Sequence, residues 1–505
     1  MASVLDLYRT VSAAWTEGRL ENVLQRQKEL ASLHSNVKKS SASLIKALTQ
    51  DLQTTNKSAA EELQLTLDTI KTLYDSLDFP KSISQEVSVK GGASATDNLV
   101  ALGPTLIDPS PYSPVASTLA PLAAAVAAGS AVIVLANKSA PVVTVELQRL
   151  IKESLDIEAI AVTDDDSADT RHQLGTRFFG VAVLQNLSER ANILKQLYQK
   201  NPLIKILSPP SGIPAAFVDR SVQDLKAVST HLYHAAIDNS RHNPLRVPRL
   251  CFVDETLIVD LEGLLSRTGP KANESLTLTT GQDNAQALSK ALKSKFPSVA
   301  KRTTMKSSGQ LPAVIALSSS DPLTVETISP VAELLTESHN GLLLIPTRSL
   351  DHGIDILSKL NRNDNSPSQA TYIFGAAKSS FYVAAFSKTL QVFINTIPQW
   401  SLAAVVPSSS SISDSRSLFS RGDFSVNKPI IQEPLRPVLE LAIRAKALWP
   451  FMSQTLRLGK IKQPKGGRLS YFERGLIVGL ALTLVAISGT SVGIHRASQH
   501  FFKRV

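Results

Sequence analysis

The stretch that decides the fold is residues 103–134, which read GPTLIDPSPYSPVASTLAPLAAAVAAGSAVIV. It closes on a short apolar run, and from residue 100 onward such runs alternate with helical stretches. Short apolar runs bounded by helices are typical of parallel sheets that are buried on both faces. We expect strands at 132–135, 158–162, 181–184, 215–218, 250–253, 314–317, 342–345, 372–374, 392–394 and 403–406. These strands fall into two series, so the sequence predicts two α/β domains.

The residues before this stretch indicate helices instead. Apolar residues recur there at intervals of three and four, which places them on one face of a helix. One such set is Leu44, Ile45, Leu48 and Leu52, and another is Leu63, Leu67, Ile70 and Tyr74. Residues 19–75 are therefore predicted to form two or more amphipathic helices.

The composition is that of a globular chain with a large core. Of the 505 residues, 43% are hydrophobic and 19% are charged, which excludes a disordered protein. The one cysteine, Cys251, excludes an internal disulfide framework and fits a reducing compartment. The net charge of +10 is not gathered into a basic run with interleaved aromatics, so we expect no nucleic-acid binding. The first residues carry no signal-peptide pattern.

Residues 475–494 carry no charge and are rich in Leu, Val, Ile, Ala and Gly. At about 1.5 Å per residue, a helix of this length spans the hydrocarbon core of a bilayer, which is about 30 Å thick. A buried core helix remains the alternative, although such a helix normally shows a polar face. We predict a transmembrane helix at 475–494, after a linker at 464–474 and before a short tail at 495–505.

Basic residues are denser before this apolar segment than after it. Those before it are Arg457, Lys460, Lys462, Lys465, Arg468 and Arg474, and those after it are Arg496, Lys503 and Arg504. The positive-inside rule then keeps the large N-terminal body in the cytosol and sends the short tail across the membrane. We expect the membrane of the endoplasmic reticulum, with the peroxisome and the mitochondrial outer membrane as alternatives.

Residues 103–134 resemble the aldehyde dehydrogenase family. In that family a strand leads to an Asn beside an aromatic residue and a Pro, then to an Ala- and Gly-rich helix and a second strand. Further stretches resemble the family in its own order, at 19–52, 214–219, 249–255, 349–355 and 424–431. The predicted C-terminal anchor is similar to that of the fatty-aldehyde branch, whose members sit on intracellular membranes.

The resemblance implies an α/β fold with two Rossmann-related domains and a small dimerisation hairpin. A cofactor-type domain with the N-terminal helices would occupy 1–207 and a catalytic-type domain 208–395. A returning and dimerisation segment would occupy 396–463. The family's hairpin and closing strand, which here ends near Ile431, form its dimer contact. This implies a homodimer, or a heterodimer with a related dehydrogenase.

The family's catalytic residues do not stand at the matching positions. Its thiolate nucleophile lies in Asn-x-Gly-Gln-x-Cys, and the matching window is 239–244, which ends in Pro244. Its general base is the Glu of Glu-Leu-Gly-Gly, where Ser208 stands. Tyr112 occupies the place of the oxyanion-hole Asn, and its hydroxyl can still donate a hydrogen bond. Cys251 is the fallback thiol, but we expect it in a strand buried on both faces.

The cofactor positions are altered as well. The family binds the pyrophosphate of NAD(P) near a helix opened by Thr-Gly-Ser-x-x-x-Gly, and the matching window, 185–191, has neither glycine. The ribose-binding Lys becomes Leu135 and the nearby acid becomes Lys138. Glu337 lies close to the place of the family's ribose-contacting Glu, with a solvated helix-end charge as the alternative.

Two polar sets suggest a metal but complete no metal motif. The first is His231, His234 and His242, and the second is Asp164, Asp165 and Asp166. We interpret the histidines as surface or cap residues and the aspartates as a loop or helix cap.

The resemblance therefore implies an aldehyde dehydrogenase-like, membrane-anchored protein that is catalytically inactive, needs no cofactor, and acts as a scaffold or regulator. The alternative is an active fatty-aldehyde dehydrogenase that uses NAD or NADP and forms carboxylic acids.

Overall fold

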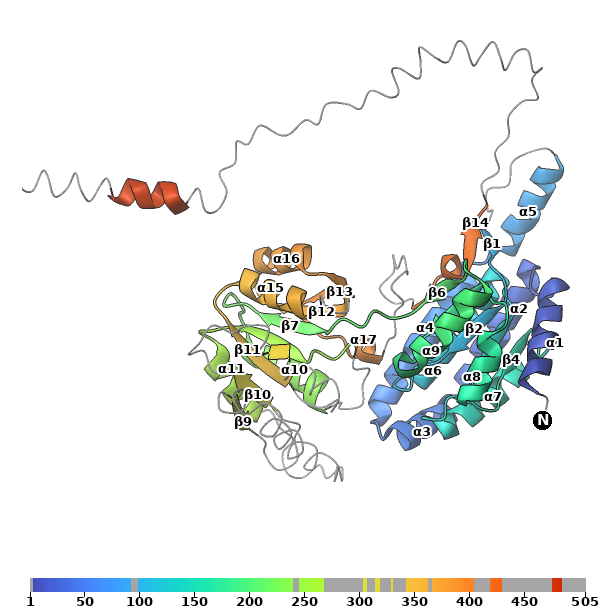
Figure 1. Ribbon diagram of the computed structural model, residues 1–505, viewed down its shortest axis with the longest axis horizontal. Helices are drawn as coiled ribbons and strands as arrows, with labels where there is room; N and C mark the ends of the chain where they lie inside the picture. The colour runs from blue at the N-terminus through green and yellow to red at the C-terminus, as the bar shows by residue number, and fades with distance from the viewer. Residues whose placement is uncertain are drawn as a thin grey trace, which may run out of the picture. The chain divides into compact units, whose positions relative to one another are not determined.

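The computed structural model describes residues 3–91, 99–238, 245–267, 303–306, 314–317, 328–329, 342–361, 366–403, 418–428 and 475–483. The chain divides into two compact units, residues 1–430 and residues 431–505. The first unit holds two large sheets and a short antiparallel pair of strands (Figure 1).

The first large sheet has five parallel strands in the order β4-β3-β2-β5-β6. The strands are β2 (Thr105–Asp108), β3 (Val132–Val134), β4 (Ile160–Val162), β5 (Val181–Leu184) and β6 (Lys205–Leu207). Parallel neighbours require a crossover between them, and the helices supply it.

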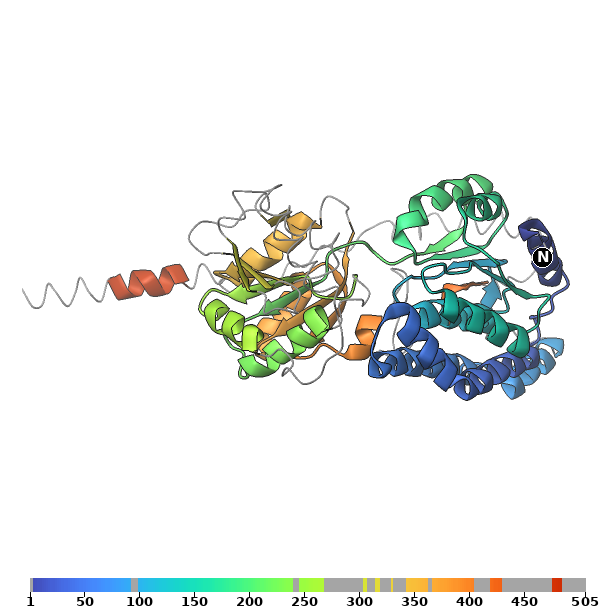
Figure 2. The ribbon, with the colours of Figure 1, turned by 90° about the horizontal axis from the view of Figure 1, so that it is seen from below.

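Helices cover both faces of this sheet (Figure 2). One face packs against α6 (Pro114–Ala128) and α7 (Pro141–Ser154), with α2 (Val23–Lys39), α3 (Ser41–Leu52) and α4 (Asn56–Asp75) in the same core. The other face packs against α1 (Val4–Thr16), α8 (Ala168–Gly175) and α9 (Leu187–Lys200).

Helix α6 is the centre of this core. Every one of its residues is buried, which explains its run of small Ala side chains. Gly129 ends the helix at a φ of 92°, and a Cβ there would lie 2.9 Å from the carbonyl oxygen of Leu20. Only glycine fits this conformation and this close approach.

The second large sheet has seven strands in the order β13-β12-β7-β8-β11-β10-β9. These are β7 (Ala215–Val218), β8 (Leu250–Asp254), β9 (Thr303–Lys306), β10 (Val314–Leu317), β11 (Leu342–Thr347), β12 (Ser368–Phe374) and β13 (Thr389–Ile394). All neighbours run parallel except β9, which is antiparallel to β10.

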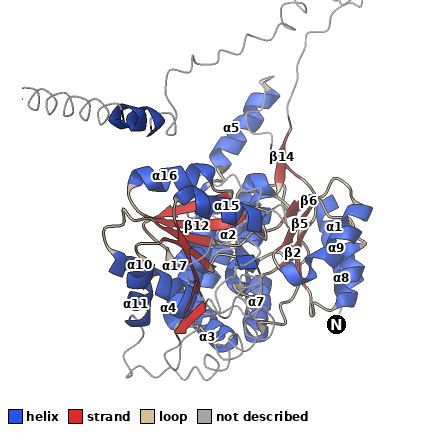
Figure 3. Cartoon of the chain, turned by 60° about the vertical axis from the view of Figure 1, so that its left-hand side comes forward, coloured by secondary structure: helices blue, strands red, loops and turns tan. Residues whose placement is uncertain are grey.

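Both faces of the seven-stranded sheet are also covered by helices (Figure 3). One face packs against α15 (Leu350–Leu360) and α16 (Ala377–Phe386), and the other against α10 (Leu225–Tyr233) and α11 (Ile258–Arg267). A one-turn π-helix, η1 (His234–Asp238), continues α10.

The remaining elements of the first unit are short. Strand β1 (Leu99–Ala101) pairs antiparallel with β14 (Ser425–Asn427), which follows the 3-10 turn η2 (Arg421–Asp423). Helix α5 (Phe79–Lys90) buries no residue. Helix α17 (Gln399–Ala403) packs against α4.

Most of the expected elements are confirmed. Helices α2, α3 and α4 occupy the stretch expected to be helical, although Tyr74 lies exposed instead of sharing the buried face. Nine of the expected strands coincide with strands of the two sheets. The strand expected at 403–406 is wrong at its first residue, because Ala403 ends α17, and 404–406 lie outside the described residues. Apolar content alone cannot separate a short helix from a strand.

In the second unit, residues 475–483 form a helix whose residues are all exposed. The rest of the predicted span at 475–494 lies outside the described residues. Within the described part of the chain, no helix has both the length and the apolar character needed to cross a membrane.

Candidate functional site

The carboxyl ends of the five-stranded sheet are where an open α/β sheet places a ligand. Asp108 ends β2, Leu135 follows β3 and Gln185 follows β5. Leu135, at the predicted ribose-binding position, is buried in the apolar core and offers no polar side chain. Lys138 forms an ion pair with Asp166, with 3.3 Å between Nζ and Oδ1. Leu135 therefore offers a nucleotide no polar group, and the ammonium group of Lys138 is shared with Asp166.

A buried ion pair lies at the end of β2. Arg171, on α8, donates a hydrogen bond from Nη1 to Asp108 Oδ2, and its Nη2 lies 3.5 Å from Asp166 Oδ2. Burial raises the pKa of Asp108 to about 6, and the nearby Arg171 cation opposes that shift. Charge at this edge of the sheet is thus neutralised by the protein's own side chains.

The start of α9 lacks the features of a phosphate site. The Gln185 backbone N donates to Asp108 O at 3.0 Å, and Gln185 Nε2 donates to Ser117 O of α6 at 2.6 Å. Glu189 lies in the first turn of α9. An anion is stabilised at a helix N-terminus by the helix dipole, and a carboxylate in the first turn offsets that attraction.

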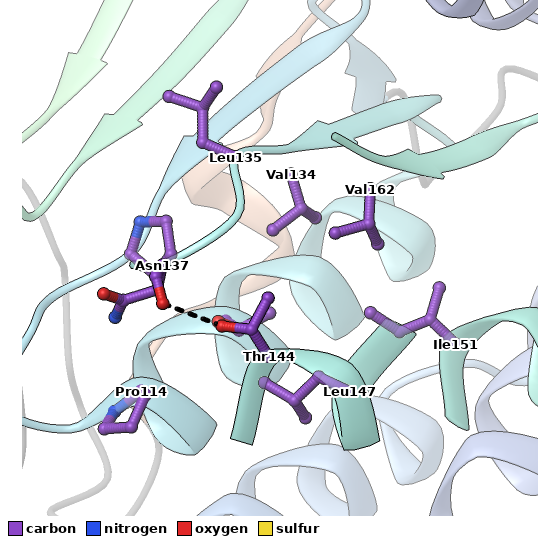
Figure 4. Close-up of a pocket in the computed structure, with 10 residues that line it drawn as sticks. Pro114, Val134, Leu135, Asn137, Thr144, Leu147, Ile151 and Val162 are labelled. Carbon is purple, nitrogen blue, oxygen red and sulfur yellow. Dashed lines mark hydrogen bonds between the residues drawn. The ribbon is translucent and has the colours of Figure 1, made fainter. Parts of the chain in front are cut away.

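A small hollow lies beside the end of β3 (Figure 4). Val134 and Asn137 border it on one side, and Thr144 and Leu147 of α7 border it on the other. Thr144 Oγ1 donates to Asn137 O at 3.0 Å. The hollow has a volume of about 10 Å³, which admits about one water molecule. This hollow is therefore too small for a dinucleotide.

The N-terminus of α6 is occupied by a carboxylate of the chain itself. Glu62, on α4, accepts hydrogen bonds from the backbone N–H groups of Val115 at 2.9 Å and Ala116 at 3.0 Å. Its side chain is buried, and burial raises the pKa of Glu62 to about 7 although the two N–H donors oppose the shift. This helix end is consequently closed to an external anion.

We expect Glu62→Gln to remove a pH-dependent loss of stability. The folded pKa of Glu62 lies above its ordinary value of 4.5, so the stability that Glu62 contributes is fully present below about pH 4.5 and is lost as the pH rises through 7. At about 1.36 kcal/mol per pKa unit, the loss is on the order of 3 kcal/mol. Between about pH 4.5 and pH 8, the free energy of unfolding of the variant, measured in urea, should therefore rise by that amount relative to the natural chain. Parallel pH profiles for the two proteins would contradict a buried, titrating Glu62.

Tyr112, at the predicted oxyanion position, lies half-buried in the loop between β2 and α6. Its backbone N–H donates to Ser110 Oγ at 3.3 Å. Burial raises the pKa of the Tyr112 hydroxyl, and the nearby Arg249 cation opposes the shift. Tyr112 therefore lies within electrostatic reach of Arg249, which immediately precedes β8 in the other large sheet.

Ser208, at the predicted general-base position, has a structural contact. Its Oγ accepts a hydrogen bond from Arg190 Nη1 at 2.9 Å, and the same nitrogen donates to Pro209 O at 3.1 Å. Arg190 of α9 thereby fixes the segment that leads from β6 to β7. Pro244 and Glu337 lie outside the described residues.

Cys251, the fallback thiol, is the second residue of β8 and pairs with Ala216 of β7 and Leu344 of β11. It is 0% exposed and belongs to the apolar core between the sheet and α10. Burial raises the pKa of its thiol far above its usual value. A protonated thiol in the middle of a sheet is a poor nucleophile.

The polar sets interpreted as caps and surface residues hold no metal ligands in the part of the chain that the structure describes. Asp165 Oδ1 accepts from the Ser167 backbone N–H at 3.3 Å and from Thr170 Oγ1, at the start of α8. Burial lowers the pKa of His231, with His234 adding to the shift. His242 lies outside the described residues.

Sequence reasoning missed several buried charges, among them Glu62, the Asp108–Arg171 pair, and two arginines, Arg246 and Arg249. Arg249 directly precedes the apolar strand β8, and this is the signal that the sequence carries for one of these charges. Burial of the other charges depends on which helix face meets which neighbour, and that is a tertiary property.

No family model and no curated protein sequence matches the chain. Solved structures are similar to it. Substrate-bound AldH of Staphylococcus aureus is 17% identical, with a TM-score of 0.66 over 89% of this chain and 100% of that one. Aldehyde dehydrogenase C of Pseudomonas syringae, complexed with NAD⁺ and octanal, is 14% identical, with a TM-score of 0.59 over 79% and 82% of the two chains.

A third similar structure is the NADP-dependent glyceraldehyde-3-phosphate dehydrogenase of Bacillus halodurans, complexed with NADP. It is 14% identical, with a TM-score of 0.59 over 78% of this chain and 83% of that one. At identities this low, the likeness establishes architecture and leaves the chemistry to the residues of the site. The chain has the α/β fold of the aldehyde dehydrogenase superfamily.

Proposed function

We propose that this chain is a non-catalytic protein built on the aldehyde dehydrogenase fold, which acts as a scaffold or regulator at an intracellular membrane. One observation carries the proposal: the only cysteine of the chain, Cys251, is fully buried within β8. Aldehyde oxidation on this fold needs a thiolate that reaches the substrate. A buried, protonated thiol supplies none.

The state of the cofactor edge supports the same proposal. At the carboxyl edge of the five-stranded sheet lie the Asp108–Arg171 pair, the first-turn carboxylate of Glu189 and a hollow of about 10 Å³, and these features support this part of the proposal. A protein that binds no dinucleotide has no hydride acceptor. We accordingly propose that it works without NAD or NADP.

The membrane part of the proposal rests on the uncharged segment 475–494. In its described portion the apolar side chains of Leu476, Val478 and Leu482 are 57–67% exposed. A row of apolar side chains exposed in this way requires an apolar environment. We propose that the segment anchors a cytosolic body to the endoplasmic reticulum, with the peroxisome and the mitochondrial outer membrane as alternatives.

For assembly we propose a homodimer, or a heterodimer with a related active dehydrogenase. The two-stranded sheet of β1 and β14 leaves Leu99, Val100 and Val426 exposed. A short sheet with apolar side chains in solvent is a suitable place for a second protein to pack.

The competing function is an active NAD(P)-dependent fatty-aldehyde dehydrogenase. The observation that favours it is the likeness to structures solved with these cofactors, among them the Pseudomonas syringae enzyme complexed with NAD⁺ and octanal. Octanal is therefore the aldehyde on which the two functions are best separated.

We expect full-length protein in a neutral detergent to form no reduced cofactor from octanal, with either NAD⁺ or NADP⁺. The physical reason is that the one thiol of the chain is buried and that, under this proposal, no dinucleotide binds. Absorbance of the reduced nicotinamide measures this directly, and Cys251→Ala serves as the matched control. Turnover by the natural chain that disappears in Cys251→Ala would overturn the proposal in favour of the active enzyme.

A further inference from the structure

A second hollow lies at the amino edge of the seven-stranded sheet, opposite the carboxyl edge at which an open α/β sheet normally places a ligand. Its wall comes from the last turns of α15, from the segments that lead into β12 and β13, and from the first residue of β13. The hollow has a volume of about 530 Å³, and small-molecule sites occupy about 300–1,000 Å³.

The wall of this hollow is polar. Eight of its ten residues have polar side chains, and the two that do not are Leu357 and Pro367. Small-molecule sites are lined predominantly by apolar side chains, so a wall of this kind selects a ligand that is rich in hydrogen-bonding groups. The polar set includes Asp355, Ser358, Lys359, Ser387, Lys388 and Thr389.

One hydroxyl of the wall lacks a partner. The Oγ of Ser387 is buried and has no hydrogen-bond partner in the described part of the chain. The backbone N–H of Ser387 donates to Val383 O at 2.9 Å at the end of α16, so the side chain is the group that is left over. Buried hydroxyls are normally hydrogen-bonded, and a ligand in the hollow that Ser387 lines would supply the missing bond.

The charges around the hollow cancel. Lys359 and Lys388 contribute two positive charges, and Asp355 contributes one negative charge. Helices α15 and α16 both end at this wall, at Leu360 and Phe386, and a helix C-terminus carries roughly half a negative charge. The balance favours neither an anion nor a cation over a neutral ligand. The carbonyl oxygens of the two helix ends and the two ammonium groups still offer acceptors and donors.

Two aromatic rings lie exposed at the end of α16 that leads to Ser387. Tyr382 and Phe386 are 40% and 59% exposed, and their ring centroids are 4.8 Å apart. The two residues are four positions apart, so they share one side of the helix. The face of an aromatic ring is electron-rich, and it therefore attracts the C–H groups on the flat side of a sugar ring.

We propose that this hollow binds a neutral, polyhydroxylated ligand, a sugar or a related polyol. The hydroxyls of such a molecule donate to the helix carbonyls and accept from the lysine ammonium groups. The molecule carries no charge, which suits a wall whose own charges are balanced. This inference goes beyond the proposed function and does not depend on it, because no residue of the hollow belongs to the candidate site described above.

The test uses full-length protein in a polyoxyethylene detergent, which contains no sugar group, and saturation-transfer NMR, which detects weak binding on the protons of the ligand. The neutral probes are glucose, maltose and myo-inositol, and their charged counterparts are glucose 6-phosphate and glucosamine. We expect at least one neutral probe to bind, and neither charged probe to bind more tightly than the best neutral one. Ser358→Trp places a large side chain in the hollow and should abolish binding.

Two exposed residues of the wall test the charge balance. Lys388→Met removes a donor and a positive charge, so it should weaken binding of the best neutral probe by roughly three- to ten-fold and raise the affinity for glucosamine. Asp355→Asn should instead raise the affinity for glucose 6-phosphate. Lys378→Met is the matched control, an exposed lysine at the other end of α16, and should bind the probes as the natural chain does.

The inference is overturned if none of the three neutral probes binds, if a charged probe is the tightest ligand of the natural chain, or if folded Ser358→Trp binds as the natural chain does. Equal affinities of Lys388→Met and Lys378→Met for the best neutral probe would contradict it as well. Because Asp355, Lys378 and Lys388 are exposed, their variants should keep the fold, and the test does not depend on Ser358→Trp alone.

Discussion

Iodoacetamide is expected to alkylate Cys251 on the order of a thousand-fold more slowly in the native protein than in urea, even at the low end of ordinary domain stability. The thiol is 0% exposed, lies between Ala216 and Leu344 in the middle of the seven-stranded sheet, and is held protonated by burial. Alkylation then requires β8 to leave the sheet, and core strands open with nearly the full free energy of unfolding. Mass spectrometry of timed samples measures the rate.

The matched control is Leu203→Cys in a Cys251→Ala background. Leu203 is 89% exposed, so a thiol there should react at the rate of a free thiol, whether or not urea is present. Cys251 reacting in the native protein within about ten-fold of that control would mean that the thiol is reachable. The central support for a non-catalytic body would then be lost.

The fold was predictable because its signal is local. Runs such as 132–134 and 181–184 are uniformly apolar, and strands buried on both faces must be so. Helix α6 follows from its small residues and the glycine that stops it. The list of expected strands lacks β1, β2, β6, β9 and β14. Two features that the apolar pattern could not supply are β6 (Lys205–Leu207), which carries a lysine at a half-buried edge of the sheet, and the helical state of Ala403. Both depend on neighbours distant in sequence.

The candidate site was likewise predictable only in part. The sequence showed which residue types occupy the positions of the family's catalytic residues. It did not predict the contacts that Tyr112, Ser208 and Cys251 make in the structure. Ser208 accepts a hydrogen bond from Arg190, eighteen positions earlier, and Tyr112 lies within electrostatic reach of Arg249 of the other large sheet. Electrostatic pairing of this kind is set by how the elements pack, so it cannot be predicted from the spacing of residues along the chain.

Arg171→Met is expected to lower the free energy of unfolding by about 3–5 kcal/mol, because it leaves a buried carboxylate without its cation. Asp108 is buried at the end of β2, and Arg171 is the group that opposes the burial-driven rise of its pKa. Without that cation the pKa of Asp108 rises above 6, so the deficit relative to the natural chain should grow as the pH rises beyond 6. Urea unfolding at about pH 5 and pH 8 measures both effects.

Asp108→Asn separates this ion pair from a mere loss of packing. Arg171 would keep Asp166 at 3.5 Å, so the single change should cost less than Arg171→Met. The double variant should recover part of the stability lost in Arg171→Met, since it removes the uncompensated carboxylate as well. If the two costs simply add, the ion pair is not what stabilises the carboxyl edge of this sheet. A deficit in Arg171→Met that is the same at both pH values would argue equally against it. An intact pair, by contrast, means that the carboxyl edge of this sheet is held together by the protein's own charges.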